Sequence, residues 1–221
     1  MNQPYPDKLV IIGAGGFAKE VAWLWRCCKA AGHSVPDLLG FVAPPAGMQS
    51  WDGIAVLGDD QWAMAHLPRG TGFVIGLGSS AARKSLAEAY EALGFQPISL
   101  IHPEAKIGSN CRIGEGTLVC AGSTITVDVR IGRHVLINLH VTIGHDSEVG
   151  DFSAISPGVH LSGHSIIGPC CDLGTGAMTI PGIRVSAHTI LGAGTVVNRN
   201  LEEGGTYVGV PARKVRSGRT P

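Results

Sequence analysis

Aliphatic side chains recur at every sixth residue over a long stretch of the chain, and the register never shifts. The series has sixteen positions, and fifteen of them are Ile, Leu or Val. The sixteen positions are Ile107, Ile113, Val119, Ile125, Ile131, Ile137, Ile143, Val149, Ile155, Leu161, Ile167, Leu173, Thr179, Val185, Leu191 and Val197. A period of six fits neither a helix nor an alternating strand. It predicts very short strands joined by tight turns and stacked as a parallel β-helix, in which neighbouring coils bury a continuous inner column.

The first hundred residues alternate between apolar runs and helical patterns. Apolar runs predict strands at 8–12, 38–44, 54–57, 73–75 and 97–100, and helical spacing predicts helices at 21–31, 59–66 and 80–93. Strands that alternate with helices are typical of a small parallel α/β sheet. We therefore expect a Rossmann-like α/β domain at 1–100, a β-helix at 101–200 and a closing segment at 201–221.

Glycine-rich turns follow two of the predicted strands. Backbone amides at the start of a helix bind phosphate oxygens, and parallel sheets bind ligands at the carboxyl ends of their strands. We expect a nucleotide phosphate at these turns, held by Gly13, Gly15, Gly16, Phe17, Gly78 and Ser79. NAD(P) is disfavoured, because the strand at 38–44 ends without the acidic residue that binds its ribose. A tight turn that binds nothing is the alternative.

Composition narrows the class of protein. The chain has 17 acidic and 17 basic residues, which gives no reason to expect nucleic acid or a membrane surface as a partner. It contains no apolar run of the ~18 residues that a membrane span needs, and it begins without a signal-peptide pattern. The six cysteines form no CxxC pair, so we expect free thiols in a reducing cytoplasm.

Four motifs together resemble one family. They are IIGAGGFAKEV at the start, SLIHPEAKIG at the junction, GHDSEVGDF in the repeat and VGVPARKV at the end. Over residues 8–216 the chain resembles the hexapeptide-repeat sugar acetyltransferases, which include the bacillosamine-pathway and perosamine N-acetyltransferases and the sialic-acid O-acetyltransferases. The resemblance implies a left-handed β-helix with three hexapeptides per coil, a homotrimer, and acetyl-CoA as co-substrate in bacterial glycan and surface-polysaccharide biosynthesis.

The chain departs from the family at the end of the second strand. Members that act on nucleotide-linked sugars usually carry an Asp-Asp pair there, which helps to seat the nucleotide. This chain has Val42-Ala43-Pro44-Pro45 instead. The departure puts the nucleotide carrier and its base in question.

The candidate catalytic pair is His145-Asp146. His145 follows the inward residue Ile143 by two positions, so it points away from the core. A neutral imidazole accepts protons near pH 7, and a neighbouring carboxylate orients the ring and favours the imidazolium. The resemblance places the family's general base and carboxylate on this pair. The other histidines of the repeat are expected to be solvated or at an interface: His134, His140, His160, His164 and His188.

The resemblance also implies an acetyl-CoA site along the coils. Gly163 would lie near the thioester, and Gly192 and Ala193 would line the pantetheine arm. Val210, Pro211, Arg213, Lys214 and Arg216 lie in the closing segment, where cations would meet the CoA phosphates; a basic solvated tail is the alternative. Asn138 is a candidate contact to the sugar or a turn asparagine.

We therefore expect transfer of acetyl from acetyl-CoA to the amine of a nucleotide-linked sugar. O-acetylation of sialic acid or of another glycan sugar is the closest alternative. A zinc enzyme similar to the γ-carbonic anhydrases would need histidines where the chain has Gly150 and Ser109, so we expect no metal. A binding protein with an inactive site is the remaining alternative.

Overall fold

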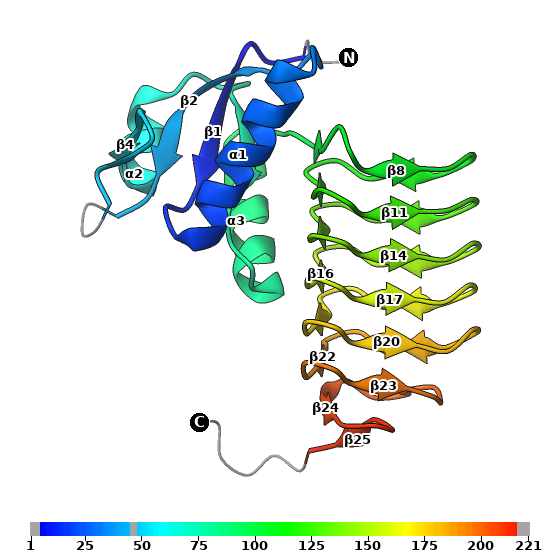
Figure 1. Cartoon of the computed structure of the whole chain (residues 1–221). Coiled ribbons are helices and arrows are strands. Elements are labelled where there is room, and N and C mark those ends of the chain that lie inside the picture. The colour runs from blue at the N-terminus through cyan, green and yellow to red at the C-terminus, as the bar shows by residue number, and fades with distance from the viewer. Residues whose placement is uncertain (1–4, 45–47, 216–221) are drawn as a thin grey trace. The chain divides into compact units, whose positions relative to one another are not determined.

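Two compact units succeed one another in the chain, with the division between Pro103 and Glu104. The structure is a computed structural model that describes residues 5–44 and 48–215 (Figure 1). The division lies close to the boundary expected after residue 100. Residues 201–215 form part of the second unit, where β24 and β25 extend one of its sheets.

The first unit is an α/β sheet with the strand order β3-β4-β2-β1-β5-β6. All neighbouring strands are parallel except β3 and β4. The central strand β1 is buried from Leu9 to Ile12. The elements are β1 (Lys8–Ile12), α1 (Gly16–Ala30), β2 (Asp37–Val42), β3 (Ser50–Trp51), β4 (Ile54–Gly58), α2 (Asp60–His66), β5 (Gly72–Ile75), α3 (Ser80–Ala92), β6 (Gln96–Pro97) and β7 (Leu100–Ile101).

Two predictions for this unit are wrong in detail. The single strand expected at 97–100 is two separate strands, because only β6 pairs with β5. The hairpin of β3 and β4 was not expected, although its turn is Asp52-Gly53, a pair that favours the two left-handed residues of a type I′ turn. Both residues have positive φ, 49° and 79°.

The second unit is the predicted left-handed β-helix, built from three columns of short strands (Figure 1). Paired strands are parallel except β24 and β25, which are antiparallel. The first column contains β8 (Lys106–Ile107), β11 (Thr124–Ile125), β14 (Thr142–Ile143), β17 (His160–Leu161), β20 (Met178–Thr179) and β23 (Val196–Val197). The second contains β9 (Arg112–Ile113), β12 (Arg130–Ile131), β15 (Glu148–Val149), β18 (Ile166–Ile167) and β21 (Arg184–Val185). The third contains β10 (Leu118–Val119), β13 (Leu136–Ile137), β16 (Ala154–Ile155), β19 (Asp172–Leu173), β22 (Thr189–Leu191), β24 (Gly205–Val208) and β25 (Arg213–Lys214).

The register pairs each residue with the residue eighteen positions later, so Thr142 pairs with His160 and Ile143 with Leu161. From Val119 to Val197 every residue of the six-residue series is buried; only Ile107 and Ile113, in the first coil, are not. The series therefore forms the inner core, as expected.

Buried hydroxyls connect neighbouring coils. Ser123 Oγ donates to the carbonyl of Asn138 and accepts from the amide of Val141. Thr117 makes the same two contacts with Gly132 and Val135, 2.9 and 3.1 Å long. A buried polar group that is fully hydrogen-bonded avoids the cost of desolvation. The small polar residues four positions after the inward residue therefore join one coil to the next.

Each turn of the β-helix contains one residue in the left-handed conformation, three positions after the inward residue. Six of these residues are glycines and nine carry side chains. The nine are Asn110, Asp128, His134, His140, Asp146, Phe152, His164, Cys170 and His188, with φ between 51° and 62°. Left-handed residues with side chains are uncommon, and Asn, Asp and His are enriched among them. Glycines directly after the inward residue have a different role: a Cβ on Gly144 would lie 2.5 Å from the amide nitrogen of Gly163, in the next coil.

One histidine of the repeat is not solvated, contrary to expectation. His134 is only 2% exposed, and its ring stacks on Phe152, eighteen residues later, with ring centroids 5.5 Å apart and planes at 4°. Exposed side chains are confirmed for His140, His160, His164 and His188.

The thiol of Cys171 is part of the core. Burial raises its pKa to about 11, so the thiol stays neutral near pH 7. Within residues 5–44 and 48–215, no helix has the length and apolar character to cross a membrane.

Adjacent isoleucines in β18 provide a matched test of the core. Ile167 is buried and Ile166 is half-buried on the outer face. We expect Ile167→Ala to lower the free energy of unfolding by about 2–5 kcal/mol, because it removes buried methyl groups and leaves a cavity. Ile166→Ala should cost much less. Equal losses in denaturant unfolding would contradict the inward register.

Candidate active site

The predicted catalytic pair lies in the turn after β14. His145 Nδ1 is 2.7 Å from Asp146 Oδ2, and the two side chains are 56% and 46% exposed. An ionised carboxylate only accepts hydrogen bonds, so the Nδ1 proton belongs to the imidazole. In the neutral ring, Nε2 then has the free lone pair, which is the form that a general base requires.

Gly163 lies directly beneath the imidazole, one coil later. A Cβ at this position would be 2.6 Å from His145 Nε2, so a side chain here would displace the ring from its present position. The amide of the next residue, His164, donates to the carbonyl of His145 over 2.8 Å and fixes the two turns together. The structure thus brings together His145, Asp146 and Gly163.

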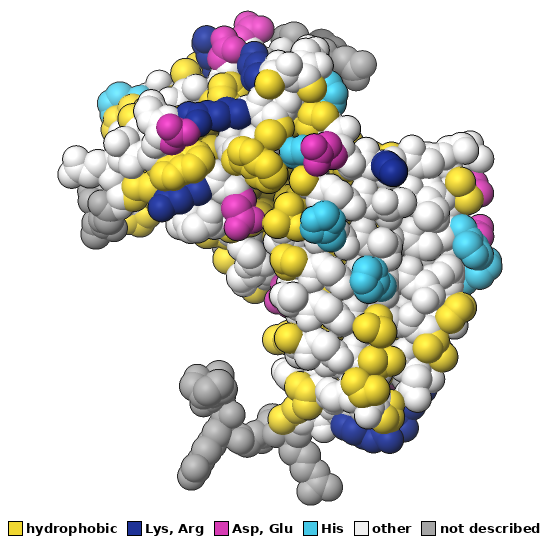
Figure 2. Space-filling view, viewed as in Figure 1, with side chains coloured by type: hydrophobic (Ala, Val, Ile, Leu, Met, Phe, Trp, Pro, Cys, Tyr) yellow, Lys and Arg dark blue, Asp and Glu magenta, His cyan; other side chains and the backbone are white. Residues whose placement is uncertain are grey.

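His164 also belongs to this cluster, although its sequence context predicted a solvated or interface histidine. Its Nε2 is 3.8 Å from Asp146 Oδ2, and its ring meets that of His145 edge-on with centroids 5.0 Å apart. The sequence spacing is consistent with this contact, because His164 follows Asp146 by the eighteen residues of one coil. Figure 2 shows histidine and acidic side chains gathered at the edge of the β-helix where these turns lie.

The pKa of Asp146 is lowered in this environment. The hydrogen bond from His145 is the largest cause, and the charge of His164 acts in the same direction. Partial desolvation opposes both effects. The carboxylate is therefore ionised throughout the neutral range and ready to stabilise an imidazolium.

In the α/β unit, the predicted phosphate-binding turn lies where the order of strands reverses. The carboxyl ends of β1 and β5 are neighbours, with Ile12 opposite Ile75, and a ligand-binding crevice is expected at such a switch point. Gly13 has φ of 105° and turns the chain toward α1. Gly15 is the N-cap and Gly16 and Phe17 begin the helix; the first turn contains no acidic residue.

Space around this turn differs sharply from one glycine to the next. A Cβ on Gly15 or Gly16 would meet nothing within 4 Å, so the amides of the helix start are accessible. A Cβ on Gly76 would lie 2.7 Å from Cα of Ala18, so a small residue on each side lets α1 pack closely on the sheet. This packing explains why alanine occupies the third position of the glycine pattern.

The second predicted turn is held by Arg83, a residue that no sequence motif indicated. Gly78 and Ser79 are exposed, and Ser79 Oγ caps α3 by accepting from the amide of Ala82 over 3.4 Å. Arg83 is 2% exposed and donates to the carbonyls of Leu77 and Gly78 over 3.3 and 2.6 Å. The sequence alone gives little indication of this role for Arg83, because an arginine at one position of a helix has many possible roles.

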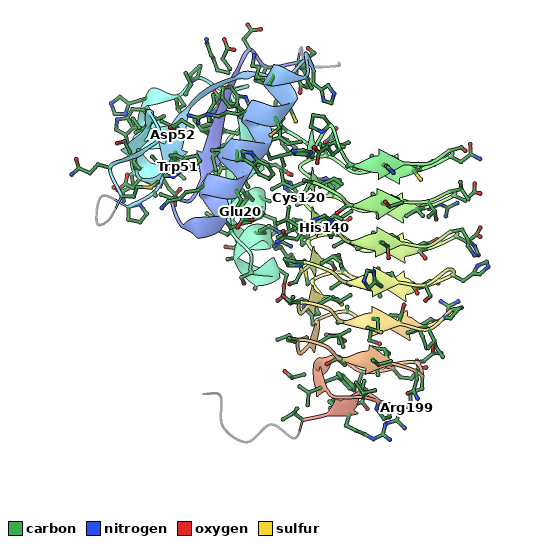
Figure 3. All side chains as sticks on the ribbon, in the orientation of Figure 1. Glu20, Trp51, Asp52, Cys120, His140 and Arg199 are labelled. Carbon is green, nitrogen blue, oxygen red and sulfur yellow. The ribbon has the colours of Figure 1, made fainter. Side chains whose placement is uncertain are left out.

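The end of β2 carries no acidic pair in its described residues. Ala43 is buried and its amide donates to the carbonyl of Gly58; Pro45 lies outside the described residues. The carboxylate of the β3–β4 hairpin, Asp52, is paired with Arg26, which also stacks over Trp51 at 5.7 Å (Figure 3).

The remaining predicted contacts lie at another corner of the β-helix. Asn138 follows β13 and Gly192 and Ala193 follow β22, both in the third column, whereas His145 and Gly163 follow strands of the first. Asn138 Oδ1 accepts from the amide of Leu139 over 2.8 Å, as a turn asparagine does. Ala193 is exposed. One chain alone does not bring these residues to His145.

Arg213 and Lys214, two of the three predicted cations of the closing segment, are exposed. Val210 is 73% exposed and forms a cis peptide with Pro211. Lys214 Nζ is 2.8 Å from Glu203 Oε2, which raises the lysine pKa and lowers the glutamate pKa, while the Arg213 guanidinium donates to the carbonyl of Ala212.

Arg199 is a further cation at this end of the β-helix, and no sequence motif indicated it (Figure 3). It lines a cavity of about 360 Å³ together with Tyr207 and Lys214. The remaining predicted cation, Arg216, lies outside the described residues.

Comparison with protein families matches residues 8–90 to the family described as the PglD N-terminal domain. GDP-perosamine N-acetyltransferase of Escherichia coli O157:H7 is 28% identical over 94 residues. That alignment covers 42% of this chain and 42% of the relative, so it spans less than half of the relative's length.

Solved structures match both units of the chain. The acetyltransferase domain of PglB from Neisseria gonorrhoeae FA1090 is 30% identical, with a TM-score of 0.86, over 95% of this chain and 100% of that chain. A perosamine N-acetyltransferase from Caulobacter crescentus, with one histidine replaced by asparagine and in complex with CoA and GDP-perosamine, is 32% identical. Its TM-score is 0.86, over 93% of this chain and 95% of that chain.

Removal of the imidazole tests the electrostatics of the pair. We expect His145→Ala to raise the pKa of Asp146 toward that of an ordinary aspartate, measured by NMR titration of the carboxyl carbon. His160→Ala, which alters an exposed histidine bonded to Thr142, is the matched control and should leave the Asp146 pKa in place. A lowered Asp146 pKa that persists in His145→Ala would contradict the assigned contact.

The same shift has a consequence for stability. Because the carboxyl is more acidic in the folded state, its ionisation favours folding above the ordinary aspartate pKa. This contribution is lost as the pH falls from the ordinary aspartate pKa through the lowered pKa of Asp146. Over that pH range the free energy of unfolding should therefore fall less in His145→Ala than in the parent.

Proposed function

Because the chain belongs to the family of hexapeptide-repeat sugar acetyltransferases, we propose that it transfers the acetyl group of acetyl-CoA to the amine of a nucleotide-linked amino sugar. The observation that carries the proposal is the His145-Asp146 pair with Nε2 directly above Gly163. The pair lies in a chain whose two units both align with acetyltransferases, one of them in complex with CoA and GDP-perosamine.

The reaction needs a base and no covalent intermediate. The neutral sugar amine attacks the thioester carbonyl, a C–N bond forms, and the C–S bond then breaks to release CoA. His145 Nε2 takes the proton that the amine loses, and Asp146 stabilises the imidazolium through Nδ1. A backbone N–H beside Gly163 would stabilise the oxyanion of the tetrahedral intermediate. The proton on Nε2 is then available for the leaving thiolate.

Acetyl-CoA would extend along the β-helix from the thioester at Gly163. We assign the pantetheine arm to Gly192 and Ala193, and the phosphates to Arg213 and Lys214 with Val210 and Pro211 beside them. Arg199 adds a further positive charge near that end. Since Gly163 and Gly192 occupy different corners of one chain, the proposal requires the corner of a second copy. A homotrimer of the kind implied by the family resemblance supplies it.

The sugar nucleotide would bind through the α/β unit. The open helix start at Gly15 and Gly16, and the turn at Gly78 and Ser79 held by Arg83, offer amide donors to its phosphates. Asn138 remains a candidate contact to the sugar. Acetyl-CoA and sugar nucleotides are cytoplasmic metabolites, so we place the reaction in the cytoplasm, in the biosynthesis of a bacterial glycan.

O-acetylation is the second candidate, and one observation favours it. Ala43 is buried where the family pattern has an acidic pair that seats the nucleotide. An acceptor that carries no nucleotide would need no nucleotide-binding residues in the α/β unit. The same imidazole would activate the hydroxyl of such an acceptor.

An acceptor panel distinguishes the two candidates. We expect acetyl-CoA and one group of nucleotide-linked amino sugars, among UDP-, GDP-, dTDP- and CMP-sugars, each to raise the thermal midpoint; saturation at a hundred times Kd adds ~2.7 kcal/mol. Mass spectrometry should then show one added acetyl group that survives mild alkali, as an amide does. The matched control is the same nucleotide with a hydroxyl in place of the amine. Acetylation of that control, lost in alkali, would support the ester-forming alternative.

Kinetics test the base. We expect His145→Asn to lower kcat by about 10²–10⁴, the range for loss of a general base, while stabilisation by acetyl-CoA and by the acceptor persists. His188→Asn replaces an exposed histidine in the turn after β21 with a residue that tolerates the left-handed conformation, and should keep full turnover. Undiminished kcat in His145→Asn would remove the assignment.

A further inference from the structure

We propose that His145, Asp146 and His164 form a binding site for a divalent transition ion such as Zn²⁺, and that occupancy of this site switches off the catalytic base. Binding rests on the three side chains alone, whereas inhibition also rests on the proposed function. Each residue offers one ligand atom, and these atoms all lie within 4.8 Å of one another.

Geometry brings the three ligand atoms close from two successive coils. His145 Nδ1 and His164 Nε2 lie 2.7 and 3.8 Å from the same oxygen, Asp146 Oδ2. In a tetrahedral site with metal–ligand bonds of about 2.0–2.1 Å, neighbouring ligand atoms are roughly 3.3 Å apart. The two distances to Asp146 Oδ2 lie on either side of this value and all three atoms lie within 4.8 Å of one another, so side-chain rotations would bring them to it.

Rigidity of the backbone favours the site. Asp146 and His164 both occupy left-handed turn positions, with φ of 57° and 58°, and the His164 amide is bonded to the His145 carbonyl. The side chains themselves are 46–63% exposed, so they can rotate and an ion can reach them. Water would fill the remaining coordination positions.

The ligand set selects the class of ion. Two imidazoles and one carboxylate suit Zn²⁺ and other late divalent transition ions, whereas Mg²⁺ and Ca²⁺ prefer oxygen ligands throughout. The second carboxylate at this corner, Asp128, lies one coil before Asp146 and accepts from Asn110 Nδ2 over 3.1 Å. It adds negative charge near the site without being needed as a ligand.

Occupancy changes the tautomer of the base. In the metal-free pair, Nδ1 carries the proton and Nε2 has the free lone pair. An ion bound at Nδ1 displaces the proton there and uses the Nδ1 lone pair. A neutral ring must then carry its proton on Nε2, so Nε2 cannot accept a proton from the acceptor amine. The ion also takes the Asp146 oxygen that would stabilise the imidazolium.

Direct binding of Zn²⁺ tests the site without any substrate. Tag-free, chelator-treated full-length protein is titrated with Zn²⁺ by isothermal calorimetry in parallel with His164→Asn and His188→Asn. We expect one site per chain in the parent and in His188→Asn. His164→Asn should weaken it at least about tenfold, the loss that even outer-shell partners of metal ligands produce. The same affinity and stoichiometry in His164→Asn would overturn the proposal.

Initial rates test the switch, each variant being compared with its own chelator-treated rate. Loss of the thioester absorbance is followed with and without saturating Zn²⁺. We expect inhibition of at least about tenfold in the parent and in His188→Asn, and little in His164→Asn at the same Zn²⁺ concentration. Zn²⁺ bound at full stoichiometry with no loss of rate would overturn the switch. A protein that binds Zn²⁺ as expected but acetylates no acceptor would contradict the proposed function alone.

Discussion

Hydrogen bonds between successive coils determine where every other feature of the β-helix lies. The amide of Gly144 donates to the carbonyl of Leu161, and the amide of Thr142 donates to the carbonyl of Val159. The same pattern continues down the columns and leaves no freedom in register, because a shift would expose the aliphatic series. Residues one coil apart therefore lie above one another, whether they belong to the core, as Ile143 and Leu161 do, or to the site, as His145 and Gly163 do.

This arrangement separates stability from chemistry. The inward residues and the buried hydroxyls of Ser123 and Thr117 hold the stack, while the turn that carries His145 and Asp146 leaves both side chains exposed. The turns have a backbone requirement instead, one left-handed residue each, which aspartate and histidine tolerate better than branched residues do. Asp146 meets both demands, since it adopts the left-handed conformation and presents its carboxylate to the neighbouring imidazole.

The sequence predicted the β-helix, its core and the proximity of Gly163 to His145, because burial and coil length leave a strict period in the residues. It did not predict that Asp146 and His164 share a corner, because that step requires coil length and turn conformation to be considered together. Nor did it place His134 inside, since stacking on Phe152 depends on a contact between coils. The roles assigned to Gly192, Ala193 and Arg213 came from the family resemblance, and no local pattern of these residues would have produced them.

The left-handed corner column that begins at Asn110 and continues through Asp128, Asp146 and His164 has a consequence for how such chains diverge. Removal of one whole coil would shorten the column and keep the order of its remaining members. Removal of a single hexapeptide would preserve the aliphatic core yet rotate every later turn to the next corner, and so place a foreign side chain under His145. Coils, rather than hexapeptides, are thus the units in which this half of the protein can gain or lose length while its chemistry is inherited intact.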